Sequence, residues 1–207
     1  MASLLNREVV VASHNPGKVI EIQTLFVPHA VRISSAIKFD LAEPDETGTT
    51  FAANARLKAV AARDSTGLTA IADDSGLVVP ALGGAPGIYS ARWAGPNKNF
   101  SIAIKRLEKE LGAKNPSAHF VCALAVAWPE GPCELFEGKI FGTLVFPARG
   151  ENGFGYDPVF RPRGSERTFG EMRPAQKEQM SHRKNAFSKL SKQCFGMEPK
   201  AKTFKSR

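Results

Sequence analysis

The chain has 207 residues, of which 43% are hydrophobic and 23% are charged, and its formal net charge is +8. This composition is typical of a globular domain and excludes a disordered or collagen-like chain. No apolar run approaches the length of a membrane span. The three cysteines are widely spaced and odd in number, so they predict neither a disulfide framework nor a zinc site. We therefore expect a cytoplasmic protein with no membrane partner.

The positive charge is concentrated toward the C-terminal end. Residues 161–207 contain 13 Lys or Arg and 4 Asp or Glu, whereas residues 1–160 have a balance of −1. Such a region attracts the phosphates of a nucleic acid or a nucleotide, or it is a solvated helix face with a loose tail. We expect one folded domain over residues 1–196 and a basic tail over residues 197–207.

Hydrophobic periodicity and capping residues predict strands that alternate with helices. Strands are predicted at residues 8–13, 31–34, 68–74, 119–128 and 134–145. Helices are predicted at residues 16–26, 51–63, 100–111 and 174–195, the last with a break near Ser181. The alternation predicts an α/β fold, and the hairpin formed by the last two strands makes the sheet mixed.

Residues 12–18, Ala-Ser-His-Asn-Pro-Gly-Lys, connect the first strand to the first helix. The free N–H groups at the start of a helix bind anions, Gly17 permits close approach, and Lys18 adds positive charge. Ser13 and Asn15 offer side-chain hydrogen bonds. The stretch lacks the pattern of a P-loop, so by itself it is equally a phosphate loop or a turn.

Two acidic segments follow. Residues 43–46, Glu-Pro-Asp-Glu, place three carboxylates within four residues, which suits Mg²⁺ or Ca²⁺ but also a solvated loop. Asp73 and Asp74 end the predicted strand 68–74, at the sheet edge where α/β sites usually lie. Successive strand side chains face opposite ways, so one of the two acids should face a metal while the other faces different surroundings. The alternative is that one of them caps a turn.

The last candidate segments are aromatic and basic. In residues 153–157, Gly-Phe-Gly-Tyr-Asp, Phe154 or Tyr156 would stack on a base and Asp157 would accept its hydrogen bond, unless the aromatics fill the core. Ser181 is a suitable N-cap, after which His182 and Arg183 begin a helix. The helix dipole disfavours positive charge there, which indicates an anionic or acceptor-rich ligand or else a basic surface helix.

Together these segments resemble the inosine triphosphate pyrophosphatase family, also called Ham1-like proteins or XTP/dITP diphosphatases. The matching segments run in family order from Ser13 to Arg183, over most of the chain. They are residues 13–18 (Ser-His-Asn-Pro-Gly-Lys), 46–51 (Glu-Thr-Gly-Thr-Thr-Phe), 72–77 (Ala-Asp-Asp-Ser-Gly-Leu), 82–92 (Leu-Gly-Gly-Ala-Pro-Gly-Ile-Tyr-Ser-Ala-Arg), 153–158 (Gly-Phe-Gly-Tyr-Asp-Pro), and Lys177 with residues 181–183 (Ser-His-Arg).

The resemblance implies a long mixed β-sheet flanked by helices, with two lobes and the site in the cleft between them. It also implies a homodimer that hydrolyses ITP, dITP and XTP to the monophosphate and pyrophosphate with Mg²⁺. Alternatives from other classes are a basic nucleic-acid-binding module and another metal-dependent nucleotide phosphatase. The acidic segments would repel a nucleic acid, so we expect a purine nucleoside triphosphate as the partner instead.

The resemblance also assigns roles to residues of this chain. Glu46 and Asp74 would hold Mg²⁺, with Glu43 and Asp45 as alternatives to Glu46. Asp74 would accept the proton of the attacking water, or Asp73 if the geometry is reversed. His182 and Arg183 would donate to the 6-keto oxygen of the base. The expected substrate-binding residues are Ser13, His14, Asn15, Pro16, Gly17, Lys18, Ser75, Phe154, Gly155, Tyr156, Asp157, Lys177, His182 and Arg183, among which His14 has no assigned task.

Overall fold

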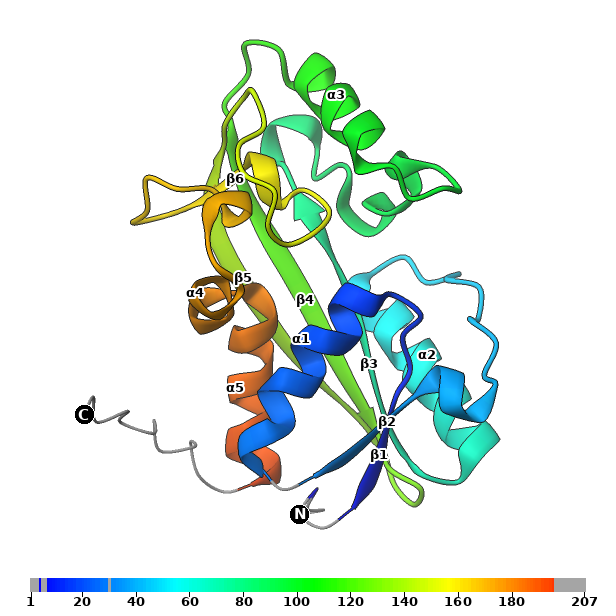
Figure 1. Ribbon diagram of the computed structural model, residues 1–207. Helices are drawn as coiled ribbons and strands as arrows, with labels where there is room; N and C mark the ends of the chain where they lie inside the picture. The colour runs from blue at the N-terminus through cyan, green and yellow to red at the C-terminus, as the bar shows by residue number, and fades with distance from the viewer. Residues whose placement is uncertain (1–3, 5–6, 30, 196–207) are drawn as a thin grey trace, which may run out of the picture.

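The structure, a computed structural model, describes residues 4, 7–29 and 31–195, so the predicted tail at residues 197–207 lies outside it. A long twisted sheet runs through the molecule between two groups of helices (Figure 1). Its strands are β1 (Glu8–Val11), β2 (Arg32–Ser35), β3 (Thr69–Val78), β4 (Ser117–Ala127), β5 (Cys133–Leu144) and β6 (Phe160–Pro162). The helices are α1 (Pro16–Phe26), α2 (Phe51–Thr66), α3 (Phe100–Leu111), α4 (Pro174–Met180) and α5 (His182–Cys194).

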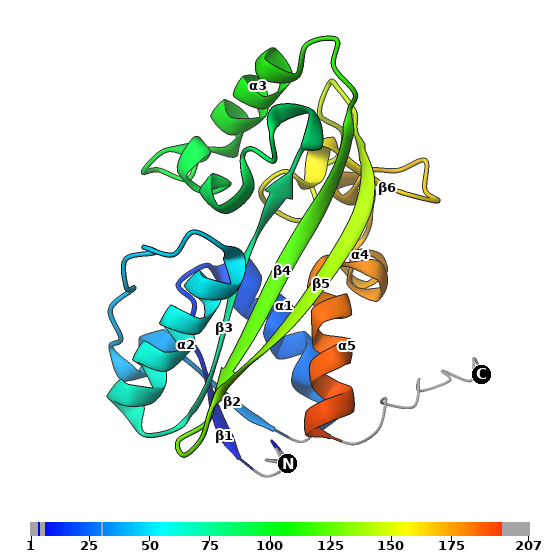
Figure 2. The same cartoon turned by 180° about the vertical axis from the view of Figure 1, so that it is seen from behind.

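The sheet is mixed, as the sequence predicts. Its strand order is β2-β1-β3-β4-β5-β6. β1 is parallel to both β2 and β3, whereas the β3–β4, β4–β5 and β5–β6 pairs are antiparallel. The long strands β3, β4 and β5 belong to both lobes, so the sheet holds the two lobes together (Figures 1 and 2).

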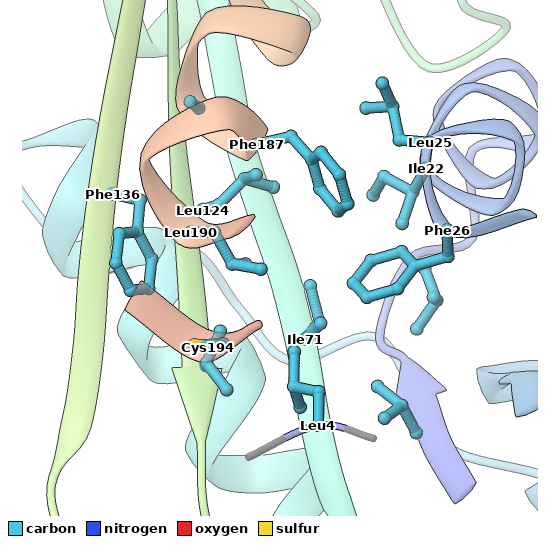
Figure 3. Close-up of a cluster of buried hydrophobic side chains, with 14 of the residues drawn as sticks. Leu4, Ile22, Leu25, Phe26, Ile71, Leu124, Phe136, Phe187, Leu190 and Cys194 are labelled. Carbon is cyan, nitrogen blue, oxygen red and sulfur yellow. The ribbon is translucent and has the colours of Figure 1, made fainter. Parts of the chain in front are cut away.

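The lower lobe in Figure 1 carries α1 and α5 on one face of the sheet. Ile22, Leu25 and Phe26 follow the three-to-four-residue spacing of one helix face, and all three are buried. Phe26 meets Phe187 of α5 edge to face at 4.8 Å between ring centroids. Figure 3 shows these side chains converging on the sheet, where they close the apolar core of this lobe.

Helix α2 covers the opposite face of the same lobe (Figure 2). Its Ala55 and Ala59 lie four residues apart and pack on alanines of β3 and β4. Small side chains on both sides bring the helix close to the sheet. Asn54 and Lys58 are also buried on this helix, which places polar groups beside the central strands.

The upper lobe contains α3, β6 and the irregular segments around them (Figures 1 and 2). Leu107 of α3 and the rings of Phe120, Phe160 and Phe169 form its separate apolar core. Two cores on one sheet give the two-lobed shape that the resemblance implied. In the described part of the chain, no helix has both the length and the apolar character needed to cross a membrane.

The predicted end of the third strand at Asp74 is wrong. β3 continues to Val78, and residues 75–78 pair with residues 119–122 of β4. The polar Asp-Asp-Ser-Gly run suggests a turn, but pairing with β4 and the complete burial of Leu77 keep it extended. Asp73 and Asp74 therefore lie in mid-strand, between the two lobes, and not at the edge of the sheet.

Candidate active site

A cavity of about 400 Å³ lies between the lobes. The residues that line it include members of the β1–α1 connection, the acidic segment (residues 41–48), α2, β3, the glycine-rich loop (residues 153–157), α4 and the start of α5. Of the predicted site residues, the cavity is lined by Ser13, Asn15, Lys18, Glu46 with its alternatives Glu43 and Asp45, Asp74, Ser75, Phe154, Gly155, Tyr156, Asp157, Lys177 and His182. The tertiary fold thus brings together segments that are far apart in the sequence.

The β1–α1 connection begins α1 at the cavity. Asn15 is the N-cap, and its side-chain oxygen accepts a hydrogen bond from the Lys18 N–H at 3.3 Å. Pro16 occupies the first turn, where its missing N–H costs no hydrogen bond. Of the first-turn N–H groups, those of Lys18 and Val19 are used by Asn15, so the Gly17 N–H and the Asn15 side-chain NH₂ are the donors beside the Lys18 ammonium, an arrangement that suits an anion.

Three predicted residues of this connection do not line the cavity. His14 points to a second cavity of about 240 Å³, where its Nε2 lies 2.8 Å from the Leu41 carbonyl oxygen. Gly17 lies against Phe154, and a Cβ at this position would be 2.6 Å from the ring. Pro16 and Gly17 therefore shape the loop, while His14 connects it to the acidic segment.

Asp73 and Asp74 have opposite surroundings, as their positions in an extended strand predict. Asp74 is 4% exposed, and its Oδ2 accepts a hydrogen bond from the side chain of Asn54 at 3.0 Å. Burial raises the pKa of Asp74, although Lys58 and Lys18 oppose the rise. A raised pKa suits a carboxylate that accepts a proton or binds a cation.

Asp73 faces a group of cations. Arg183 Nη2 lies 2.8 Å from Asp73 Oδ2, and Lys18 Nζ lies 3.4 Å from the same oxygen. Burial alone would raise the pKa of Asp73, but Lys18, Arg183 and Lys58 outweigh it and hold the pKa well below its ordinary value. Asp73 is thus an ionised partner for these cations, whereas Asp74 faces the cavity.

The acidic segment also lines the cavity and has no regular secondary structure. Glu46 Oε1 is 2.5 Å from Lys58 Nζ, and the Glu46 carbonyl accepts a hydrogen bond from Arg92 Nη2 at 2.8 Å. Among the described residues, no three His, Cys, Asp or Glu side chains cluster closely enough to hold a metal by themselves. Glu46 and Asp74 fit Mg²⁺ nonetheless, because this ion commonly takes one or two carboxylates and completes its shell with water and phosphate.

Residues 154–157 form an aromatic wall of the cavity. Lys177 Nζ lies 2.6 Å from Asp157 Oδ2 and 4.5 Å from the centroid of the Phe154 ring. Burial raises the pKa of Asp157, although Lys177 opposes the rise. Tyr156 is 2% exposed, and its hydroxyl donates to the Ser90 carbonyl at 3.0 Å. Tyr156 therefore anchors the loop in the upper lobe, and Phe154 presents the more accessible ring.

His182 and Arg183 point in different directions from the start of α5, where Ser181 is the N-cap. His182 stacks on Phe120 at 4.9 Å between ring centroids, and its Nδ1 has no hydrogen-bond partner among the described residues. Arg183 is 1% exposed and pairs with both Asp73 and Glu21. Arg183 does not line the main cavity, so only His182 of this pair reaches it.

Sequence reasoning missed four residues of this site: Glu21, Asn54, Lys58 and Arg92. Asn54 and Lys58 interrupt the buried alanine face of α2 at helical spacing, a signal that the sequence does contain. Glu21 follows Lys18 by three residues and so projects from a nearby face of α1. Arg92 ends the family motif at residues 82–92, but sequence reasoning assigned it no role, because Arg92 is exposed and its partner Glu46 is 46 residues away.

Comparisons with known proteins identify the family of this chain. A profile of the Ham1 family matches residues 9–193. A dITP/XTP pyrophosphatase from Bradyrhizobium sp. (strain BTAi1) is 54% identical over 203 residues, which cover 92% of this chain and 95% of the relative. A dITP/XTP pyrophosphatase from Caulobacter vibrioides is 54% identical over 194 residues, which cover 92% of this chain and all of the relative.

Solved structures give the same result. The HAM1 protein from Coxiella burnetii superposes with a TM-score of 0.84 at 36% identity and covers 92% of this chain and all of its own. The Ham1 protein of Staphylococcus aureus superposes with a TM-score of 0.82 at 38% identity, with 93% and 100% coverage. The chain belongs to the Ham1 family.

Proposed function

We propose that the protein hydrolyses dITP, XTP and ITP to the nucleoside monophosphate and pyrophosphate. One observation carries this proposal: a single cavity is lined by the N-terminus of α1 with Lys18, by the carboxylates Glu46 and Asp74, and by the aromatic residues Phe154 and Tyr156. The first two sets suit a triphosphate with a divalent metal, and the aromatic residues suit a base. The names of the relatives, dITP/XTP pyrophosphatases, support the substrate class.

In this proposal the triphosphate binds at the start of α1. The Gly17 N–H, Ser13 and the Asn15 amide donate to phosphate oxygens, and Lys18 supplies positive charge. Lys18 Nζ lies 3.4 Å from Asp73 Oδ2. A bound phosphate would therefore either share the Lys18 ammonium with Asp73 or replace Asp73 as its partner. Ser75 completes this end, where its hydroxyl donates to Asp73 at 3.0 Å.

Glu46 and Asp74 are the residues that would hold Mg²⁺, which when bound neutralises phosphate charge and lowers the pKa of a bound water. Asp74 accepts a proton from the attacking water. The water oxygen forms a new bond to phosphorus, and the bond between the α- and β-phosphates breaks to release pyrophosphate. The Asp74 carboxylate is oriented for this task, because its Oδ2 accepts a hydrogen bond from the Asn54 side chain and its Oδ1 accepts one from the Ser75 N–H.

In the same proposal, the base binds against the aromatic wall at residues 154–157. Phe154 stacks on the ring, Asp157 and Lys177 contact its edge, and His182 donates to the 6-keto oxygen. Burial lowers the pKa of His182 well below its ordinary value, so the imidazole is neutral and has one donor nitrogen and one acceptor nitrogen. Adenine presents an amino group in place of the keto oxygen; the neutral imidazole can accept from it, but the Lys177 ammonium can only donate and would face a second donor at that edge.

That Arg183 contacts the base stays a prediction, and its ion pairs limit how it could do so. Its guanidinium is held by Asp73 and Glu21, so a contact with the base requires one of these pairs to open. If Arg183 reads the base, Arg183→Ala should narrow the preference for ITP over ATP. An unchanged ratio would assign base reading to the cavity-lining residues alone.

A homodimer and a cytoplasmic location also stay predictions, and light scattering of the purified protein tests the first.

The nucleic-acid alternative rests on the basic C-terminal segment. Part of that charge is neutralised internally, because Lys177 and Arg183 pair with Asp157, Glu21 and Asp73. Steep salt dependence of binding to a nucleic acid, without nucleotide turnover, would favour the alternative.

Product analysis with a panel of triphosphates and Mg²⁺ tests the proposed function. We expect pyrophosphate from ITP, dITP and XTP at rates well above those from ATP and GTP. Each reaction is run with and without a chelator, which also tests the metal. Release of orthophosphate without pyrophosphate would contradict the proposed bond cleavage and favour another nucleotide phosphatase.

A further inference from the structure

Asn54 is a buried polar side chain that the packing of α2 does not explain. It is 0% exposed and lies four residues before Lys58, so both project from one face of the helix. Their neighbours Ala55 and Ala59 form the apolar contact with the sheet. A buried amide is costly unless its donors and acceptors are paired, so the partners of Asn54 indicate its task.

Those partners lie on two different segments of the site. Asn54 Oδ1 accepts a hydrogen bond from the Gly48 N–H at 2.8 Å, and Asn54 Nδ2 donates to Asp74 Oδ2 at 3.0 Å. A backbone N–H can only donate and a carboxylate only accepts, so these partners fix the orientation of the amide. One side chain therefore connects the acidic segment to β3.

The connection is tight at both ends. A Cβ added to Gly48 would lie 2.5 Å from Asn54 Oδ1 and 2.8 Å from Ala53 Cβ, so this approach requires glycine. At the other end, Asp74 Oδ1 accepts from the Ser75 N–H at 2.9 Å while Oδ2 is held by Asn54. Both oxygens of the Asp74 carboxylate are thereby oriented, and Gly48 lies only two residues beyond Glu46.

We propose that Asn54 is a positioning residue that fixes the separation and orientation of the Glu46 and Asp74 carboxylates. The inference rests on the proposed function, since it assigns these two carboxylates to a divalent metal. Asn54 touches neither metal nor nucleotide and acts through Gly48 and Asp74. Its loss would remove the hydrogen bonds that connect Gly48 to Asp74, so that Glu46 is held only by Lys58 and Arg92 and its position relative to Asp74 is less well fixed.

The test measures binding of Mn²⁺ to the full chain without nucleotide, by calorimetry or by the electron paramagnetic resonance of the free ion. Asn54→Ala should weaken Mn²⁺ binding by about tenfold or more, the usual effect of losing an outer-shell partner. Thr168→Val is the matched control. Thr168 is also 0% exposed and its hydroxyl makes two hydrogen bonds, but these go to Arg149 and Glu171 in the upper lobe.

Thermal unfolding of both variants separates positioning from stability. We expect comparable losses of stability, with Mn²⁺ affinity lost in Asn54→Ala alone. Equal Mn²⁺ affinity in wild type and Asn54→Ala would overturn the inference, as would a wild type that binds no Mn²⁺. If Asn54→Ala does not fold, Gly48→Ala displaces the same oxygen and should weaken Mn²⁺ binding, whereas unchanged affinity there counts against the inference.

Failure of the proposed function is a separate result. It appears as a wild-type protein that binds Mn²⁺ in an Asn54-dependent way but releases no pyrophosphate from ITP, dITP or XTP. Failure of the inference appears instead as an active wild type whose Mn²⁺ affinity does not depend on Asn54. The two assays use the same preparations, so the outcomes are directly comparable.

Discussion

Arg183 and Asp73 are 110 residues apart in the sequence, and they form an ion pair in which both side chains are at most 1% exposed. Arg183 also pairs with Glu21, and Glu21 pairs with Lys177, which contacts Asp157. Charges of alternating sign thus run from β3, between the lobes, to the glycine-rich loop. This series of pairs connects the phosphate end of the cavity to the proposed base end.

The first prediction concerns this pair. Asp73→Asn should lower the free energy of unfolding by about 3 to 5 kcal/mol, because it leaves the buried Arg183 charge without its closest β3 partner. Denaturant unfolding measures the change. Glu110→Gln is the control, since it breaks the exposed pair with Arg106 on α3 and should cost less than about 1 kcal/mol. Equal costs for the two variants would contradict the prediction.

The second prediction concerns Asp74, the proposed proton acceptor of the attacking water. Asp74→Asn should lower the rate of ITP hydrolysis by about a hundredfold or more, since the amide cannot accept the proton of the attacking water. The fold should persist, because asparagine keeps the shape of the buried side chain, and circular dichroism checks this. Asp64→Asn removes a carboxylate on the exposed side of α2 and should leave the rate unchanged. Wild-type turnover in Asp74→Asn would remove Asp74 from the mechanism.

The third prediction concerns His14, which hydrogen-bonds to the Leu41 carbonyl and does not line the main cavity. His14→Ala should raise the Mg²⁺ concentration needed for half-maximal activity several-fold, because the bond holds the start of the acidic segment. His14→Gln places a donor at a similar reach and should restore most of the loss. Steady-state kinetics at varied Mg²⁺ and ITP measures both. An equal rise in KM for ITP in both variants would instead show that His14 contacts the substrate.

The fourth prediction concerns pH. Burial, with Arg183 and Lys177, holds the pKa of His182 well below its ordinary value. Below about pH 6.5 the unfolded chain binds a proton that the folded protein does not, so stability is fully present above that pH and falls as the pH drops, by at most about 1.4 kcal/mol per unit. His182→Gln should flatten the stability profile between about pH 6.5 and 5. His29 and His119 remain in the variant, so the difference from wild type isolates His182. Parallel profiles would contradict the assignment.

Local sequence signals predicted the element boundaries that depend on capping. α1 begins at Pro16, α2 begins after Thr50, and Ser181 separates α4 from α5. At each of these helix starts, a capping side chain accepts a hydrogen bond from an N–H within three residues, and at α1 a proline also fits the first turn. These boundaries are therefore determined by neighbouring residues in the sequence. The end of β3 could not be found in this way, because its last residues are held by β4, more than 40 residues away.

The sequence by itself determined the alternation of strands and helices and the order of the motifs, which together identify the family. Only the tertiary structure decided which charges meet. Adjacent helical residues point about 100° apart, so His182 reaches the cavity while Arg183 turns to Asp73 and Glu21. Likewise, Asn54 and Lys58 carry no local sign that their partners are Asp74 and Glu46. Partners of this kind depend on how the helices pack on the sheet, and that packing is set by contacts between distant residues.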